Sequence, residues 1–369
     1  MRRLIATVAG LLLGGFMIDA GSQEPSTQPA RAFPEVKAPD YPLPTDLGEW
    51  QRRRAETRKT LWTLLGDLPS RPAKPAVEVI KKEDRDGYRL EHLAIDNGAG
   101  AKITSYLLVP SGAGPFPAIL WLHWHGGQYN LGKEELFRET PAKDGKRGED
   151  LVKRGHVVFA PDAYAFGERQ GQGPGGPKEK GGAEELALSK TFLWMGRTFT
   201  GMMLRDDQIA LDYLAARPEV DPKRIGATGI SMGCTRAWWL AAMDERVAAA
   251  VGICCMTRYQ ELIAAGGVNG HGIYYYVPGV LKHFDIEAVA SLIAPRPYLD
   301  FCGERDTLTP PAGTRKIYDF CRGVYALYGA PDRFRGEIVP DLGHVYTPEM
   351  WTAMTAWFGK HLRAGGTAK

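Results

Sequence analysis

The stretch RIGATGISMGCTRAWWLAAM occupies residues 224–243 and contains the pattern Gly-x-Ser-x-Gly. The residues before the pattern predict a short strand, and the apolar residues after it predict a buried helix. A serine in a sharp turn between a strand and a helix is typical of a nucleophile elbow, where glycines leave the space that a Cβ atom would fill. The free N–H groups of the helix N-terminus would face the same serine. Ser231 is therefore a candidate nucleophile, and the alternative is a tight structural turn.

Strands and helices alternate along much of the chain. Continuous apolar runs predict strands buried on both faces at 118–123, 157–160, 247–254 and 297–301, with a last strand at 335–339. Helical patterns fall within 134–154 and at 202–216, 315–328 and 348–362. Upstream, a helix at 47–65 precedes alternating segments at 77–80, 88–95 and 103–109, which predict antiparallel strands. This order predicts an α/β fold with a mostly parallel central sheet, helices on both faces and antiparallel N-terminal strands.

Two segments fall outside this alternation. Residues 167–182 are dense in Gly, Pro, Gln, Lys and Glu, and residues 266–283 carry the consecutive tyrosines at 274–276. Long loops in a compact domain tend to be functional. The second segment follows the strand after Ser231, so we expect it to overhang the carboxyl edge of the sheet, where α/β folds place their chemistry.

The N-terminal residues predict export. Two arginines, an apolar run at 4–18 and small residues at 20–22 form a signal-peptide pattern, so we expect residues 1–22 to be removed. The apolar run is shorter than the roughly 20 residues of a spanning helix, and a retained anchor is the alternative. Residues 23–46 predict a flexible leader, and residues 47–365 a single α/β domain. We expect a periplasmic or secreted protein that does not stay inserted in a membrane.

The composition is that of an ordinary globular protein. Of the 369 residues, 44% are hydrophobic and 24% are charged, and the formal net charge of +3 is too small to favour a nucleic-acid partner. The cysteines are Cys234, Cys254, Cys255, Cys302 and Cys321. Their apolar surroundings favour small buried side chains, and a Cys302–Cys321 bridge is the alternative.

A serine nucleophile needs a base, which is usually a histidine that a carboxylate orients. In elbow folds the chain order is Ser, then Asp or Glu, then His. His344 lies between the last predicted strand and the last helix, whereas His271 and His283 come too early and His361 lies inside the closing helix. His344 is the candidate base, and the alternative is a histidine that caps the helix.

The carboxylate of such a triad should follow the penultimate strand. Glu304 and Asp306 share the loop after that strand, whereas Asp300 lies inside the strand and Asp319 inside the next helix. We predict that Asp306 orients His344, with Glu304 as the alternative.

An oxyanion needs two preorganised donors. One is the backbone N–H of Met232, directly after the candidate nucleophile, and the other should come from the loop after the early strand. That loop reads His-Trp-His-Gly-Gly-Gln at 123–128. We predict Gly127 as the donor, with Gln128 as the alternative. His123 and His125 have a spacing that metal ligands use, but no third ligand cluster is evident, so we expect no metal and a structural role beside the turn.

Aromatic and amide side chains near these loops are candidates for substrate contact. Trp124 and Gln128 lie in the oxyanion loop, and Tyr275 and Tyr276 lie in the later tyrosine segment. Aromatic rings can stack on sugars or aromatic esters, and ordinary packing is the alternative.

These features together resemble the α/β-hydrolases. The resemblance rests on the triad order, the His-Gly-Gly turn, and the segments DAYAFGER at 162–169 and MMLRDD at 202–207, and it covers about residues 45–363. The most similar branch is the dienelactone hydrolase and acetyl xylan esterase-like group. Dienelactone hydrolases use a cysteine nucleophile, whereas this chain has Ser231, which favours simple ester hydrolysis. Cys234 lies inside the following helix and cannot replace it.

The sequence thus predicts a secreted serine carboxylic-ester hydrolase that needs no cofactor and works through an acyl-enzyme. The resemblance implies acetyl or aromatic esters of carbohydrates or small molecules as substrates. One alternative is a serine peptidase of the prolyl oligopeptidase type, for whose propeller domain too few residues precede the hydrolase portion. The other is a non-catalytic binding protein of the same fold, which would usually lack a triad member.

Overall fold

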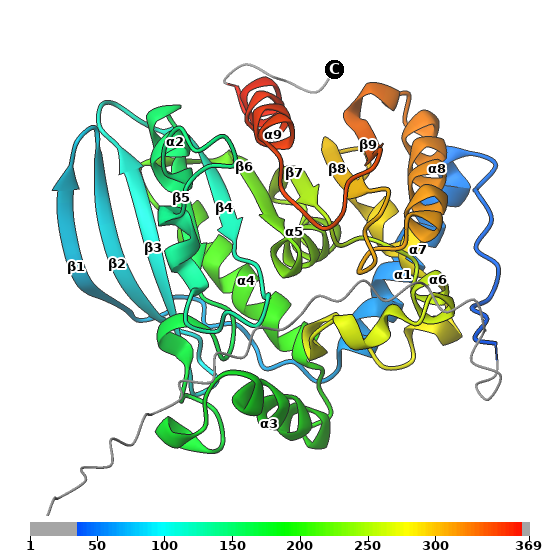
Figure 1. The fold of residues 1–369 in the computed structure, drawn as a ribbon, viewed down its shortest axis with the longest axis horizontal. Helices are drawn as coiled ribbons and strands as arrows, with labels where there is room; N and C mark the ends of the chain where they lie inside the picture. The colour runs from blue at the N-terminus through cyan, green and yellow to red at the C-terminus, as the bar shows by residue number, and fades with distance from the viewer. Residues whose placement is uncertain (1–34, 364–369) are drawn as a thin grey trace, which may run out of the picture. The chain divides into compact units, whose positions relative to one another are not determined.

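Parallel strands form the centre of the sheet, and antiparallel strands extend it on one side. The computed structural model describes residues 35–363. In these residues the strand order is β1-β2-β3-β5-β4-β6-β7-β8-β9, and Figure 1 shows it from left to right. Pairing is antiparallel from β1 through β3 to β5 and parallel from β5 to β9. The strands are β1 (Val77–Arg85), β2 (Tyr88–Asp96), β3 (Lys102–Pro110), β4 (Phe116–Leu122), β5 (Val157–Pro161), β6 (Val220–Ile230), β7 (Val247–Ile253), β8 (Tyr298–Gly303) and β9 (Phe334–Val339).

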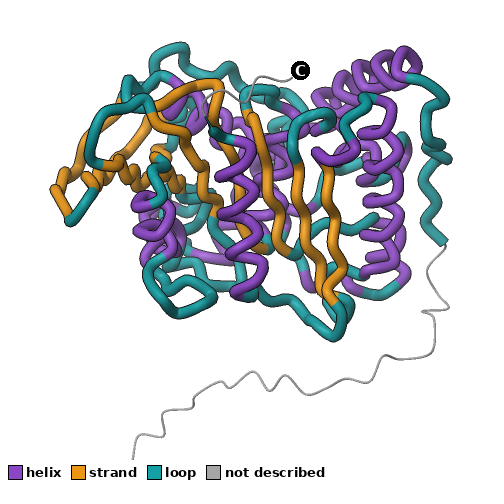
Figure 2. The backbone as a smooth tube through the Cα atoms, turned by 90° about the horizontal axis from the view of Figure 1, so that it is seen from above, coloured by secondary structure: helices purple, strands orange, loops and turns teal. Residues whose placement is uncertain are grey.

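Helices cover both faces of the sheet, as Figure 2 shows from above. The helices are α1 (Leu47–Leu65), α2 (Arg147–Lys153), α3 (Gly181–Trp194), α4 (Phe199–Ala215), α5 (Met232–Met243), α6 (Tyr259–Ala264), α7 (Ile286–Ala290), α8 (Pro311–Leu327) and α9 (Pro348–His361). Residues of α1, α4, α5, α7 and α8 belong to one apolar core, and residues of α2 and α9 belong to a second. Strand β4 separates the two cores because its side chains alternate. Leu120 and Leu122 face the first core, while Ile119 and Trp121 face the second.

The observed architecture confirms the predicted fold class. The strands predicted as buried runs are the central parallel strands, and the alternating N-terminal segments are the antiparallel β1, β2 and β3. Helix α3 is not among the predicted elements. It begins at the end of the Gly-rich segment 167–182, packs against α4 and lies away from the sheet in Figure 1.

The predicted signal peptide, residues 1–22, lies outside the described residues, as does the predicted leader up to residue 34. In the remainder of that leader, the ring of Tyr41 packs against Phe284 and Phe320 with centroid distances of 6.0 and 5.4 Å. From Val36 onwards the described residues belong to one unit. Within residues 35–363, no helix combines the length and apolar character that a membrane span requires.

The cysteine side chains are all buried and carry free thiols. They act as small core side chains, as the sequence predicts, and the alternative bridge between Cys302 and Cys321 is not formed. One of them, Cys234, lies with its Sγ 3.8 Å from a carboxylate oxygen of Asp300.

Asp300 is a carboxylic acid in the middle of β8 with no exposed surface. The hydroxyls of Tyr298 and Tyr318 donate hydrogen bonds to it at 2.9 and 2.6 Å. Burial raises its pKa from the ordinary 3.8 to about 7, against the opposing effect of these hydrogen bonds. The carboxyl therefore stays protonated in the folded protein over a range of pH in which the unfolded chain has lost the proton.

This difference predicts that Asp300 makes the folded protein less stable as the pH rises. Its contribution is fully present below about pH 4 and is lost as the pH rises through about 7, with each pKa unit equal to about 1.4 kcal/mol. The difference in Tm between Asp300→Asn and wild type, measured by calorimetry, should therefore shift in favour of the variant as the pH rises from 5 to 8. The exposed Asp319→Asn serves as the control. Parallel pH curves for Asp300→Asn and wild type would contradict the assignment.

Candidate active site

Ser231 occupies a strained turn between β6 and α5. Its φ of 57° and ψ of −122° lie in a region that side-chain-bearing residues rarely adopt. The turn is held because the Ser231 N–H donates to the carbonyls of Ile253 and Cys254 at 2.9 and 3.0 Å. Ser231 itself is half-buried. The amides of the first α5 turn, including that of Met232, have no intrahelical acceptors. The predicted strand–serine–helix geometry is thus present.

The two glycines of the Gly-x-Ser-x-Gly pattern are required by the closeness of β4. A Cβ atom on Gly229 would lie 2.2 Å from the carbonyl oxygen of Leu122, and one on Gly233 would lie 1.9 Å from the same oxygen. Both distances are far below van der Waals contact. The start of α5 is therefore packed directly against the end of β4, which continues into the loop 123–128.

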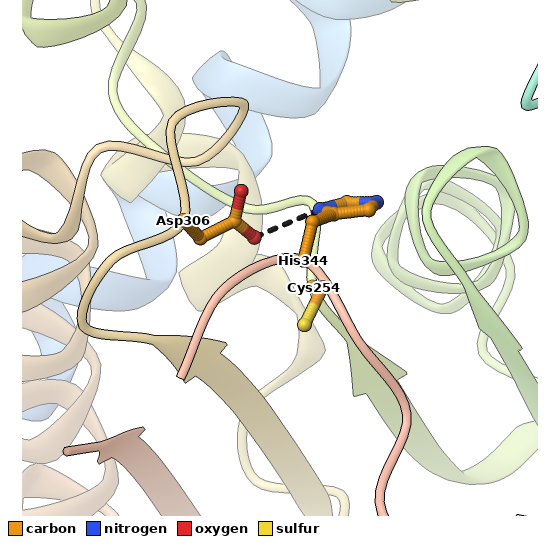
Figure 3. Close-up of side chains that lie close together, drawn as sticks. All are labelled: Cys254, Asp306 and His344. Atoms are coloured by element: carbon orange, nitrogen blue, oxygen red, sulfur yellow. Dashed lines mark hydrogen bonds and ion pairs between the residues drawn. The ribbon is translucent and has the colours of Figure 1, made fainter. Parts of the chain in front are cut away.

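Asp306 and His344 form a hydrogen-bonded pair at the carboxyl ends of β8 and β9. Nδ1 of His344 lies 2.8 Å from Oδ2 of Asp306, and the dashed line in Figure 3 marks this hydrogen bond. The other carboxylate oxygen, Oδ1, accepts the backbone N–H groups of Leu308 and Thr309 at 2.9 and 3.1 Å. Asp306 is buried and His344 is half-buried. The backbone thus fixes the carboxylate, and the carboxylate fixes the imidazole.

The loops that carry this pair are joined to each other along their length. The N–H groups of Glu304 and Arg305 donate to the carbonyls of Val339 and Leu342 at 2.9 and 2.7 Å. Gly303 allows this approach, since a Cβ atom there would lie 2.3 Å from the Leu342 oxygen. Glu304, the alternative carboxylate, is exposed and accepts the backbone N–H of Asp341 at 3.2 Å. It is therefore Asp306 and not Glu304 that contacts the imidazole.

Cys254 connects the serine turn to the histidine–aspartate pair. Its carbonyl accepts the Ser231 N–H, and its thiol lies beside the pair in Figure 3. The Cys254 sulfur, a carboxylate oxygen of Asp306 and a ring nitrogen of His344 all lie within 4.8 Å of one another. Within residues 35–363, no polar atom is hydrogen-bonded to the buried Nε2 of His344. This nitrogen is therefore free to accept a proton, and the Ser231 hydroxyl is not hydrogen-bonded to it in this structure.

The same three side chains are the kinds of residue that can bind a metal ion, but their chemistry does not favour one. Burial raises the pKa of the Cys254 thiol well above its usual range, and a thiol must lose its proton to become a ligand. His344 already uses Nδ1 for Asp306. The arrangement fits a hydrogen-bonded acid–base pair better than a metal centre.

The two histidines after β4 have structural partners at both ring nitrogens. Nδ1 of His123 donates to the carbonyl of Trp124 at 2.8 Å, and its Nε2 accepts the N–H of Ala163 at 2.9 Å. Burial lowers the pKa of His123 well below its usual range, so the ring is neutral. Both rings lie against Phe166, at centroid distances of 4.9 Å for His123 and 5.1 Å for His125.

His125 links the predicted oxyanion turn to helix α3. Its Nδ1 accepts the N–H of Gly127 at 3.1 Å, and its Nε2 lies 3.1 Å from a carboxylate oxygen of Glu185. The hydroxyl of Tyr129 donates to the same oxygen of Glu185 at 2.7 Å. Because Nδ1 is an acceptor, the ring carries its proton on Nε2 and donates it to Glu185. The N–H of Gln128, the alternative oxyanion donor, bonds the carbonyl of His125 at 2.8 Å.

The predicted substrate contacts divide between surface and core. Trp124 is half-buried between the guanidinium groups of Arg138 and Arg147, which lie 5.3 and 5.0 Å from its ring centroid. Gln128 is exposed, and its side-chain oxygen accepts a bond from Arg138 at 2.9 Å.

Tyr275 lies in the core instead. It is 1% exposed, stacks on His271 at 4.0 Å and donates to the carbonyl of Cys255 at 3.4 Å. The run of tyrosines suggests a surface, but this ring is covered, so it packs and does not face substrate. Tyr276 is half-buried, with its hydroxyl on the carbonyl of Val268.

Two residues near the site were not singled out from the sequence. Glu185 lies on the unpredicted helix α3, far along the chain from His125, so no local pattern could pair them. Glu135 is fully buried; it accepts the Trp124 N–H at 2.8 Å and pairs with Arg147 at 2.5 Å. Burial raises the pKa of Glu135 to about 7, and Arg147 opposes this effect.

Comparisons with known proteins identify the family of this chain and proteins of similar fold. A protein of Bacillus subtilis (strain 168) named "Putative hydrolase YtaP" is 40% identical over 285 residues, which cover 76% of this chain and 91% of that protein. A glucuronoyl esterase from Solibacter usitatus has a similar fold, with a TM-score of 0.65 at 20% identity over 89% of this chain and 100% of that one. Acetyl Xylan Esterase 1 from Thermoanaerobacterium sp. JW/SL YS485 superposes with a TM-score of 0.55 at 18% identity over 89% of this chain and 97% of that one. Residues 26–340 match the Abhydrolase family, and the chain belongs to that family of α/β-hydrolases.

Proposed function

We propose that this protein is an exported serine ester hydrolase that acts on acetyl or aromatic esters of carbohydrates or small molecules. The observation that carries the proposal is the pairing of His344 with Asp306 at 2.8 Å, next to Cys254, whose carbonyl accepts the N–H of a serine held at a φ of 57°. Membership of the Abhydrolase family and a fold similar to those of named esterases support it. The signal-peptide pattern at residues 1–22 supports export.

In the proposed mechanism, Nε2 of His344 takes the proton of the Ser231 hydroxyl as the oxygen attacks the ester carbonyl. Asp306 holds the proton of the imidazole on Nδ1 and stabilises the imidazolium that forms. The imidazolium then protonates the leaving alcohol, which leaves an acyl-enzyme. Water, activated by the same histidine, releases the acid and restores Ser231.

The developing oxyanion is stabilised by backbone N–H groups in this proposal. Met232 supplies one from the positive end of α5. Gly127 supplies the other, which requires its N–H to turn from Nδ1 of His125 to the substrate. Trp124 and Gln128 lie in the same loop and contact the remainder of the ester.

A positioning role for Glu185 follows from these contacts. Glu185→Gln should lower kcat about 10- to 100-fold with a smaller change in KM, because Glu185 fixes the ring of His125 and thereby the loop 123–128, from which the Gly127 N–H turns to the substrate. Kinetics and Tm are measured together, so that a purely structural loss is recognised. Glu179→Gln, in the loop before α3, is the control, and an unchanged kcat in Glu185→Gln would refute the positioning role.

The substrate class is tested with a panel of purified substrates. It contains p-nitrophenyl acyl esters, acetylated xylan, feruloyl esters and a proline-linked peptide amide. We expect turnover of esters and labelling of Ser231 by a fluorophosphonate. Faster cleavage of the peptide would favour the peptidase alternative, and binding without any turnover or labelling would favour a non-catalytic protein.

A further inference from the structure

A cleft of about 580 Å³ begins at the predicted oxyanion turn, in the size range of small-molecule sites. Its wall includes Gly127 and Gln128 from the turn and Gly181 from the first residue of α3. Because Gly127 belongs to the loop that continues from β4, and β4 packs on the serine turn, an ester bound at Ser231 would extend its non-reacting part into this cleft. We therefore expect the alcohol or acyl portion of the substrate to bind in this cleft.

The charged side chains that line this cleft are all positive. They are Arg138 and Lys180, which are both exposed, and no carboxylate is among the described lining residues. Within residues 35–363, neither cation forms an ion pair: Arg138 bonds the side-chain oxygen of Gln128 and lies over Trp124, and the Lys180 side chain makes no hydrogen bond or ion pair. Most other basic side chains near the site are paired, as Arg147 is with Glu135.

Unpaired positive side chains favour a ligand with a negative charge, and other features of the lining indicate that this ligand is a saccharide. The amides of Gln128, Asn130 and Gln170 supply donors and acceptors for hydroxyl groups. Helix α3 begins at the cleft, and no side chain caps its N-terminus at Lys180, so its first-turn N–H groups add positive potential. The Tyr129 ring packs under this end of α3 and adds an aromatic surface.

A second cleft has a different balance of charge. It measures about 500 Å³ and lies over the antiparallel strands and the segment 132–149. Its wall carries Lys81, Arg85 and Lys146 but also Glu83, Glu134 and Glu149, and Arg85 pairs with Glu83 at 2.9 Å. Its charges balance, whereas those beside the oxyanion turn do not.

We propose that the cleft between the oxyanion turn and α3 binds a carboxylate-bearing saccharide, so that the preferred ester substrate is an acidic carbohydrate. This proposal rests on the proposed ester hydrolysis at Ser231. Arg138 and Lys180 are its specificity residues. They contact the charged sugar and take no part in the reaction.

The test compares two xylo-oligosaccharides of equal backbone length, one of them with a glucuronate branch. Their binding to Ser231→Ala is measured by calorimetry at low salt. Two exposed charge pairs predict about tenfold tighter binding of the acidic sugar, and the preference should shrink at 1 M salt. Arg138→Gln/Lys180→Gln in the same background should bind both sugars equally. Lys178→Gln/Lys190→Gln, which removes the same charge from exposed positions outside the lining, should keep the preference.

Equal affinities for the two sugars in Ser231→Ala would overturn the proposal, as would a preference that survives Arg138→Gln/Lys180→Gln. The salt dependence needs no cleft variant, so a preference that does not shrink at 1 M salt overturns the proposal even if the double variant does not fold. Ester turnover by the wild type is measured separately. Turnover without a preference for acidic sugars overturns the binding proposal alone, and a preference without turnover overturns the proposed esterase.

Discussion

Ser231→Ala should lower kcat for ester hydrolysis by roughly 10⁴- to 10⁶-fold, because it removes the hydroxyl that the proposed mechanism uses as the nucleophile. The fold should be unaffected. Alanine meets the same backbone contacts as serine, and the bonds from residue 231 to Ile253 and Cys254 use its main-chain N–H. The measurement is kcat on p-nitrophenyl acetate with Tm as the check on folding.

The exposed Ser111→Ala is a matched control for this change, since it removes a hydroxyl from a surface turn after β3. Fluorophosphonate labelling should disappear in Ser231→Ala and persist in Ser111→Ala. Turnover by Ser231→Ala above about one hundredth of wild type would reject Ser231 as nucleophile.

Asp306→Asn should lower kcat about 10⁴-fold by enforcing the wrong histidine tautomer. Leu308 and Thr309 donate N–H groups to one oxygen of residue 306, so the oxygen of an asparagine amide must take that position. Its NH₂ group then faces His344 and donates to Nδ1. The imidazole proton moves to Nε2, which can no longer accept the serine proton.

Glu304→Gln is the control for this prediction, because it neutralises the other carboxylate of the same loop. Glu304 bonds the backbone of Asp341 and not the histidine, so its kcat should stay close to that of wild type. A larger loss in Glu304→Gln than in Asp306→Asn would assign the orienting role to Glu304.

The sequence predicts the central strands well because two independent signals agree there. Continuous apolar runs mark strands buried on both faces, and glycines and prolines mark their ends. Helix α3 lacks both signals. It starts in a Gly- and Pro-rich segment, and its apolar residues fall on both sides: Leu188 and Phe192 are buried, while Leu193 and Trp194 are exposed.

Some residues of the candidate site could also be predicted from the sequence, and others could not. Ser231, Asp306 and His344 follow a fixed chain order, so each position could be predicted from its place after a strand. The Glu185–His125 contact depends on how α3 folds back over the loop after β4, which no local pattern encodes. Tyr275 shows the converse, since an aromatic run indicates surface or core equally and only packing decides between them.

The contact of Gly229 and Gly233 with the single carbonyl of Leu122 has a consequence for redesign of this protein. The carbonyl of Leu122 packs against the glycines on both sides of Ser231, and the loop that leads to Gly127 starts at the next residue. Serine and loop therefore share a common origin outside the segment 167–180, whereas α3 acts on the same loop through Glu185 and His125. Exchange of the segment 167–180 between relatives should change which esters are accepted while the reacting groups keep their alignment.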